Sequence, residues 1–176
     1  LCAVARPAVG VVTRVAAVHT ATFGTLEEVA RAKGELVEAL SPDGTAVLNA
    51  ADPRVAAMAE RTAARVLTFA DGGDVQAEDV RLDAELRPSF ALVTPWGKAE
   101  VQLAVRGAHM VDNALAAAAA ALACGVAVDE VAAGLDRAGL SRWRMELETL
   151  PSGARLLNDA YNANPTSMAA ALRALA

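Results

Sequence analysis

Val9-Gly-Val-Val-Thr13 is a short run rich in β-branched residues between a proline and an arginine, which predicts a buried β-strand. Similar runs at residues 45–48, which end at Asn49, and at residues 65–69 predict two further strands. Helical patterns separate the three strands. This alternation predicts an α/β fold with a mostly parallel sheet over residues 9–69.

The two intervening helices carry recognisable start signals. Thr25 and Glu28 have the spacing of a capping box, so the first helix is expected over residues 26–40. Asp52 is a good N-cap and Pro53 suits the first helical position, so a second helix is expected through about residue 62.

Lys33 lies in the middle of the apolar stripe of the first helix, three residues after Ala30 and three before Leu36. An unpaired ammonium that faces a core is costly or gives up its proton. The position therefore requires a partner, a path to a nearby edge along which the side chain can snorkel, or a chemical modification. Snorkelling is one interpretation, and a lysine placed to meet His19 is the other.

From residue 71 to 105 the pattern changes to short strands separated by turn residues, which predicts a small antiparallel portion. These strands are expected at residues 80–82, 90–93 and 101–105. An alanine-rich helix is expected over residues 110–124, where Asn113 follows His109 by four residues and both face one way. A shorter helix begins at Asp129.

The C-terminal segment holds a polar cluster, Asn158-Asp-Ala-Tyr-Asn-Ala-Asn-Pro165. A domain boundary is expected near residue 140, followed by a strand pair at residues 145–149 and 155–157 and a helix from Met168. The cluster then occupies a strand-to-helix turn, where α/β folds often bind ligands. Ordinary turn and N-cap chemistry is the alternative interpretation.

Composition excludes several classes of protein. The chain has 176 residues, 55% of them hydrophobic, and a net charge of −5, which argues against a general nucleic-acid or membrane-surface binder. The longest apolar run, residues 114–128, is too short to span a bilayer. Cys2 and Cys124 each lie in apolar company, so we expect buried, reduced thiols without a disulfide. The first residues show no signal peptide, and the chain is expected to start within a longer protein.

No phosphate-binding loop with its glycines, lysine and hydroxyl occurs in the sequence, nor a dinucleotide-binding glycine pattern, nor a cluster with zinc spacing. We therefore expect these 176 residues alone to hold no nucleoside triphosphate and to be inactive as an isolated enzyme.

Several segments, taken in order, resemble the Mur ligases over essentially the whole chain. The segments are Thr13 to His19 with Phe23-Gly24, Arg31-Ala-Lys-Gly-Glu35, Val47-Leu-Asn-Ala50, Gly107 to Ala116, Arg144-Met-Glu146, and Asn158 to Pro165. The resemblance implies that residues 1–140 are the later part of the central ATP-binding domain. Residues 141–176 are then the start of a Rossmann-like C-terminal domain, and the phosphate-binding loop and the UDP-binding domain precede residue 1.

The resemblance also implies roles for individual residues. His19 would bind Mg²⁺, and Lys33 would be carbamylated to an anion beside the metal, where its oxygens suit Mg²⁺. Arg144 would face a phosphate, which its permanent charge suits. The remaining residues would contact the nucleotide or its surroundings: Asn49, His109 and Asn113 near the adenine, Asp159 at the ribose hydroxyls, and Asn162 and Asn164 at nucleotide or peptide groups.

The implied reaction is amide formation driven by ATP in the cytoplasm, as part of peptidoglycan synthesis. The Tyr-Asn-Ala-Asn-Pro form of the C-terminal cluster implies a ligase that joins D-alanyl-D-alanine to UDP-MurNAc-tripeptide through an acyl phosphate. The parent protein is expected to be a monomer. Arg14, Ala21, Ala51 and Met110 depart from the usual pattern. Another Mur or folylpolyglutamate-type ligase, with a different amino substrate, is one alternative. A non-catalytic α/β binding module derived from such a ligase, which Arg14, Ala21 and Ala51 favour, is the other.

Overall fold

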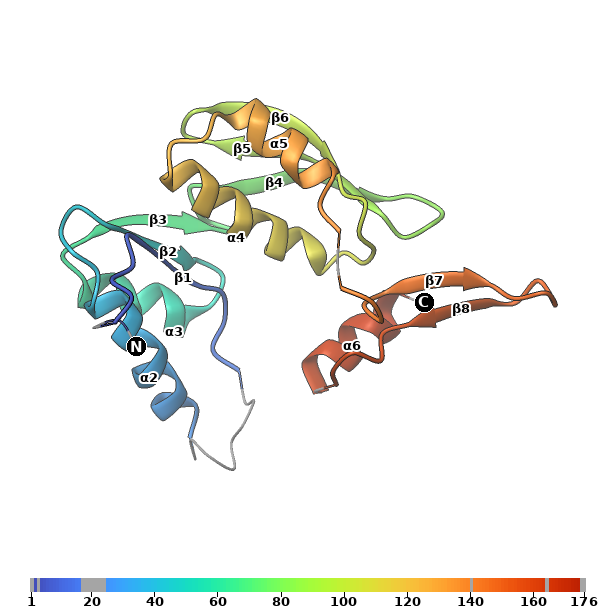
Figure 1. The fold of residues 1–176 in the computed structure, drawn as a ribbon, viewed down its shortest axis with the longest axis horizontal. Helices are drawn as coiled ribbons and strands as arrows, with labels where there is room; N and C mark the ends of the chain where they lie inside the picture. Colours follow the sequence, from blue (N-terminus) through green and yellow to red (C-terminus); the bar gives the residue numbers. More distant parts are fainter. Residues whose placement is uncertain (1, 3, 17–24, 140, 164, 175–176) are drawn as a thin grey trace.

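The computed structural model describes residues 1–176 except 1, 3, 17–24, 140, 164 and 175–176 (Figure 1). Its first sheet, sheet A, consists of β1 (Val9–Val12), β2 (Thr45–Asn49) and β3 (Arg65–Phe69), which pair in parallel in this order. Every residue of β2 is buried, as expected for the central strand of a sheet that is covered on both faces. The predicted α/β fold with a parallel sheet is confirmed.

Helices cover both faces of sheet A. Alternate residues of β2 face opposite ways: Ala46 and Leu48 belong to the core beneath α2 (Leu26–Glu38), α3 (Pro53–Ala56) and the 3₁₀ helix η1 (Ala57–Arg61), whereas Val47 belongs to the core beneath α4 (Met110–Ala123). Figure 1 shows α2 and α3 on one side of the sheet and α4 on the other. These helices cover the two faces of sheet A and leave the carboxyl ends of its three strands open.

The expected helix starts are present. Thr25 Oγ1 accepts a hydrogen bond from the Glu28 amide (3.2 Å), and Glu28 Oε2 accepts one from the Thr25 amide (2.9 Å), which completes the capping box. Asp52 caps α3 and also accepts a hydrogen bond from the Val15 amide (2.8 Å). The single helix expected through residue 62 was wrong in its second half, where the chain tightens into η1.

The antiparallel portion, sheet B, consists of β4 (Gln76–Leu82), β5 (Pro88–Thr94) and β6 (Gly97–Gln102). It shares a core with α4 and α5 (Val128–Asp136), to which Phe90 and Leu92 of β5 contribute. The buried residues of α4, most of them alanines, pack against strands of both sheet A and sheet B. Cys124 lies just beyond α4 and is exposed, so its expected burial was wrong: the chain leaves the core there to turn at Gly125.

The C-terminal segment forms a two-stranded antiparallel sheet, sheet C, from β7 (Glu146–Thr149) and β8 (Arg155–Asn158), followed by α6 (Pro165–Ala174). The helix starts three residues before the predicted Met168, because proline is well suited to the first helical position. The domain boundary at residue 140 stays a prediction. Within the described part of the chain, no helix is both long and apolar enough to cross a membrane.

Substitution of Gly73 by alanine is expected to destabilise the fold. Gly73 is buried in the turn between β3 and β4, and a Cβ there would lie 2.8 Å from the backbone N and C atoms of Phe69. The backbone would have to shift, at a cost on the order of 2 kcal/mol in the free energy of unfolding. Urea denaturation of the protein measures this change.

Gly134→Ala is the matched control, because Gly134 lies in α5 and a Cβ there meets nothing within 4 Å. This variant is expected to raise the free energy of unfolding by about 1 kcal/mol through helix propensity. Equal stabilities for the Gly73 and Gly134 variants would contradict the packing described for the turn.

Candidate functional site

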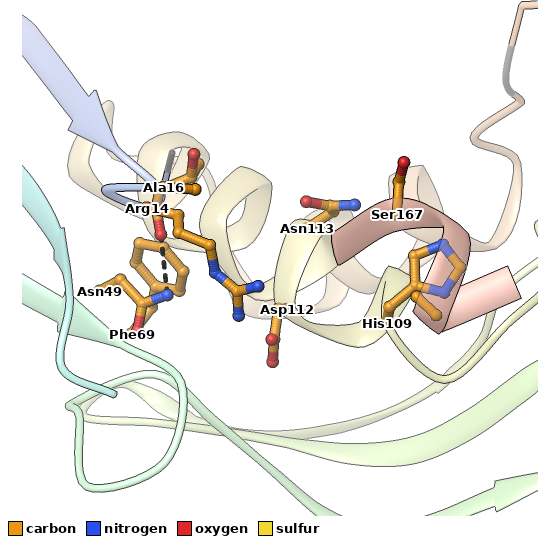
Figure 2. Close-up of a pocket in the computed structure, with 10 residues that line it drawn as sticks. Arg14, Ala16, Asn49, Phe69, His109, Asp112, Asn113 and Ser167 are labelled. Atoms are coloured by element: carbon orange, nitrogen blue, oxygen red, sulfur yellow. Dashed lines mark hydrogen bonds between the residues drawn. The ribbon is translucent and has the colours of Figure 1, made fainter. Parts of the chain in front are cut away.

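A cleft of about 250 Å³ lies at the carboxyl end of sheet A, where parallel α/β sheets bind their ligands (Figure 2). Three parts of the chain line it: the segment after β1 together with the last residues of β2 and β3, the start of α4, and α6. The lining residues are Thr13, Arg14, Ala16, Asn49, Phe69, His109, Asp112, Asn113, Ser167 and Ala170. The sheet and both helices therefore contribute side chains to one site.

Asn49 forms the wall of the cleft at the end of β2. The residue is only 4% exposed, and its Nδ2 donates a hydrogen bond to the Thr13 carbonyl (2.8 Å) while its Oδ1 accepts one from the Ala51 amide (2.8 Å). These bonds fix the amide between the ends of β1 and β2. Among the residues that the structure describes, no other hydrogen bond engages this amide, so one donor hydrogen and one acceptor lone pair are available to a ligand.

The first turn of α4 places His109 and Asn113 on the cleft, in agreement with the prediction that they face one way. Gly107 makes this possible: its φ of +97° suits glycine, and a Cβ there would lie 2.6 Å from His109 Cε1. Asn113 Nδ2 donates to the sulfur of Met110 (3.5 Å), so the methionine that departs from the family pattern contacts a predicted site residue.

His109 is half-buried, and burial lowers the pKa of its imidazole, while the negative charges of Asp159 and Asp112 act in the opposite direction. A histidine in the unfolded chain titrates near 6.5 and so binds a proton more readily than the folded one. The contribution of His109 to stability is therefore present above about pH 6.5 and is lost as the pH falls through the lowered pKa.

We expect the ring protons of His109 to titrate below pH 6.5 in an NMR pH titration. Asp159→Asn should lower the pKa of His109 further, because the substitution removes the charge that favours the imidazolium. The chain has two histidines, so His19→Gln assigns the signals. A pKa of His109 above 6.5, or one that rises in the Asp159 variant, would contradict the described surroundings of the ring.

Lys33 is exposed, and its predicted position facing the core was wrong. The buried positions of α2 are Val29, Gly34 and Val37, and the Lys33 ammonium instead donates to the Arg14 carbonyl at the end of β1 (2.8 Å). The long side chain thus reaches a polar group at the edge of the sheet, as in the snorkelling interpretation. Its amine is therefore hydrogen-bonded to the backbone of Arg14, a residue that lines the cleft.

Glycine at position 34 is explained by Arg61 of η1. A Cβ at Gly34 would collide with the Arg61 guanidinium, which crosses α2 there. The guanidinium donates to the carbonyls of Ala30 (3.4 Å) and Arg31 (3.2 Å) and pairs with Glu38. These contacts tie η1 to the part of α2 that carries Lys33.

Two predicted residues, His19 and Asn164, lie outside the described residues, as does Ala21. The Mg²⁺ site formed by His19 and Lys33 therefore stays a prediction. Among the residues that the structure describes, no group of three histidine, cysteine, aspartate or glutamate side chains is arranged to hold a metal ion.

Arg144 lies just before β7, Asp159 and Asn162 lie between β8 and α6, and none of the three lines the cleft. Arg144 lines a separate pocket of about 160 Å³ with Arg106 and Glu146, among others. Asp159 Oδ1 accepts a hydrogen bond from the Met145 amide (3.2 Å), and the exposed Asn162 accepts one from the Ala163 amide (2.9 Å). The structure thus brings together in the cleft the residues predicted to lie near the adenine, whereas the residues predicted to contact the phosphate and the ribose lie outside its lining.

The cleft also contains residues that the sequence motifs did not assign to it, above all Arg14, Asp112 and Ser167. Figure 2 shows the Arg14 side chain extending from the end of β1 into the cleft, between Asn49 and Asp112. Because Arg14 directly follows a predicted buried strand, the sequence offered a signal that could have placed it at the cleft. Asp112 and Ser167 lie on helices, and only the packing of α4 and α6 places them on the cleft.

Comparison with known proteins supports a single family. The family model described as "Mur ligase middle domain" matches residues 1–121. The UDP-N-acetylmuramoyl-tripeptide--D-alanyl-D-alanine ligase of Mycobacterium tuberculosis H37Rv is 49% identical over all of this chain and 35% of its own length. The chain therefore spans about a third of the length of this curated relative.

Solved structures show the same likeness. A crystal structure of MurF from Acinetobacter baumannii superposes with a TM-score of 0.90 at 34% identity, over 96% of this chain and 37% of that chain. MurF ligase from Thermotoga maritima in complex with ADP has a TM-score of 0.85 at 24% identity, over 99% and 40%. The second likeness shows the shared fold.

Proposed function

This chain belongs to the Mur ligase family, and we propose that it is part of an ATP-dependent ligase that joins D-alanyl-D-alanine to UDP-MurNAc-tripeptide. The observation that carries the proposal is the 49% identity, across the entire chain, to a relative named for that reaction. The cleft at the carboxyl ends of β1 to β3 is consistent with it. The enzyme acts in the cytoplasm as part of peptidoglycan synthesis.

The cleft suits the base of a nucleotide. Asn49 and Asn113 present amide donors and acceptors, and burial favours neutral His109, whose ring can accept as well as donate. Uncharged hydrogen-bonding groups of this kind match the edge of an adenine. Arg14 adds a permanent positive charge to the same cleft, which favours a ligand of negative net charge.

The ribose and the phosphates extend toward the neighbouring loop in this proposal. Asp159 is close enough to His109 for its charge to affect the pKa of the imidazole. A nucleotide bound beside His109 would therefore also lie near Asp159. Asp159 would accept hydrogen bonds from the ribose hydroxyls, and Arg144 would bind the transferring phosphoryl group. Asn162 and Asn164 would orient nucleotide or peptide groups.

Lys33 lies where it could contribute to the proposed metal site. Because the side chain is exposed, its carbamylation would not serve to remove a buried cation. The amine is exposed, and hence open to CO₂, and it already lies against the end of β1. A carbamate there, together with His19, would offer an oxygen and a nitrogen ligand to Mg²⁺. Bound Mg²⁺ supplies charge neutralisation for phosphoryl transfer. Lys33 and His19 hold the ion in this scheme.

The test is a ligase assay of the full-length protein. ADP release is expected to depend on both UDP-MurNAc-tripeptide and D-alanyl-D-alanine. Release that instead follows L-alanine or glutamate would assign the chain to another ligase of this type. A folded full-length protein that releases no ADP with any of these amino substrates would favour a non-catalytic module.

A further inference from the structure

The segment before β7 and the segment after β8 remain hydrogen-bonded to each other beyond the last residue pair of sheet C. The Tyr161 amide donates to the Trp143 carbonyl (3.0 Å), and the Met145 amide donates to Asp159 Oδ1 (3.2 Å). Trp143 and Met145 both have left-handed backbone, with φ of +64° and +50°, which side chains other than glycine rarely adopt. Residues 143–145 are thus held in a specific bend against residues 159–161.

Arg144 lies at the centre of this bend and is held from two sides. Its guanidinium carbon lies 3.9 Å from the centroid of the Tyr161 ring, and its Nε donates to Ser141 Oγ (3.0 Å). Stacking uses the face of the guanidinium and leaves its edge free. Within the described part of the chain, the Arg144 Nη groups make no hydrogen bond, so the two-pronged edge remains available to an oxyanion.

The same bend fixes the Asp159 carboxylate. Its Oδ1 accepts a hydrogen bond from the amide of Met145, the residue after Arg144. The Arg144 cation and the Asp159 anion are therefore both held by the same bend. A long arginine side chain otherwise samples many rotamers, and ordering it when a ligand binds costs free energy. The Tyr161 ring removes part of that cost in advance.

We propose that Tyr161 is a positioning residue: its ring holds the Arg144 guanidinium in a fixed relation to the Asp159 carboxylate, so that both are presented together to the phosphate and ribose groups of the nucleotide. This inference rests on the proposed function, since it takes Arg144 and Asp159 as nucleotide ligands. Tyr161 acts through Arg144 and makes no contact with the nucleotide.

The test uses the full-length ligase and compares kcat/KM for ATP. Tyr161→Leu is expected to lower it roughly fivefold, in keeping with a cation–π contact at an exposed site. Tyr161→Phe keeps the ring and is expected to retain the wild-type value. Trp143→Leu is the matched control, because it removes an exposed aromatic ring from the same segment, one that lies 5.8 Å from a different arginine, Arg142.

A double-mutant cycle separates positioning from a general structural role. In an Arg144→Ala background, Tyr161→Leu should cause no further loss, whereas a structural defect would reduce kcat/KM again. Wild-type values for Tyr161→Leu, equal losses for the Phe and Leu variants, or an additive cycle would each overturn the inference alone. An inactive wild-type enzyme would instead refute the proposed function, and the inference with it.

Discussion

Lys33→Ala in the full-length protein should lower ligase turnover by roughly a hundredfold or more, the scale on which groups that stabilise transition-state charge act. Lys33 lies on α2, and its ammonium donates to the Arg14 carbonyl just after β1, beside the cleft. In the proposed scheme its carbamate holds Mg²⁺ beside the transferring phosphoryl group. Alanine removes that anion without disturbing the core, because Lys33 is exposed.

Chemical rescue distinguishes the carbamate from a simple loss of charge. Acetate or formate in the assay should restore part of the turnover of Lys33→Ala, because a small carboxylate can occupy the place of the carbamate. Arg31→Ala is the matched control: it removes another exposed cation of α2 and should leave turnover near the wild-type value. Unchanged turnover of Lys33→Ala would exclude the proposed role.

Asp159→Ala is expected to have the second largest effect, a fall in kcat/KM for ATP of roughly tenfold to a hundredfold, as for the loss of hydrogen bonds to a charged group. The substitution removes the proposed partner of the ribose hydroxyls and also the acceptor for the Met145 amide. Steady-state kinetics with ATP as the varied substrate measures the change.

Asp159→Asn separates the two contributions of this side chain. Asparagine keeps an oxygen for the Met145 amide and loses only the charge, so its kcat/KM should lie between those of the wild-type and alanine enzymes. Glu148→Gln, at an exposed carboxylate on β7, is the control for removal of a negative charge from the same sheet. A normal kcat/KM in Asp159→Ala would refute the ribose-binding role.

The strands and most helix starts could be predicted because their signals are local. The Thr25 capping box and the Asp52-Pro53 pair each determine a helix start within a few residues, and the β-branched runs determine the strands of sheet A. Lys33 could not be placed correctly from periodicity alone. Its exposure depends on how α2 sits on the sheet and on the nearby Arg14 carbonyl, and neither is visible in a helical pattern.

Residues of the candidate site could be predicted from the sequence where they lie at the ends of strands or at the start of a helix. Asn49 ends β2 and His109 opens α4, so the topology of a parallel sheet brings them together. Asp112 and Ser167 required the packing of α4 and α6. The stacking of Arg144 on Tyr161 joins residues from both sides of sheet C, and it depends on the left-handed backbone at Trp143 and Met145.

The most direct test of the central claim, that the cleft is the nucleotide site of this ligase, is a crystal structure of the full-length protein with ADP. We predict that the adenine lies within hydrogen-bonding distance of side chains among Asn49, His109 and Asn113, with the ribose hydroxyls at Asp159. Density for ADP at another surface, with this cleft unchanged, would contradict the claim.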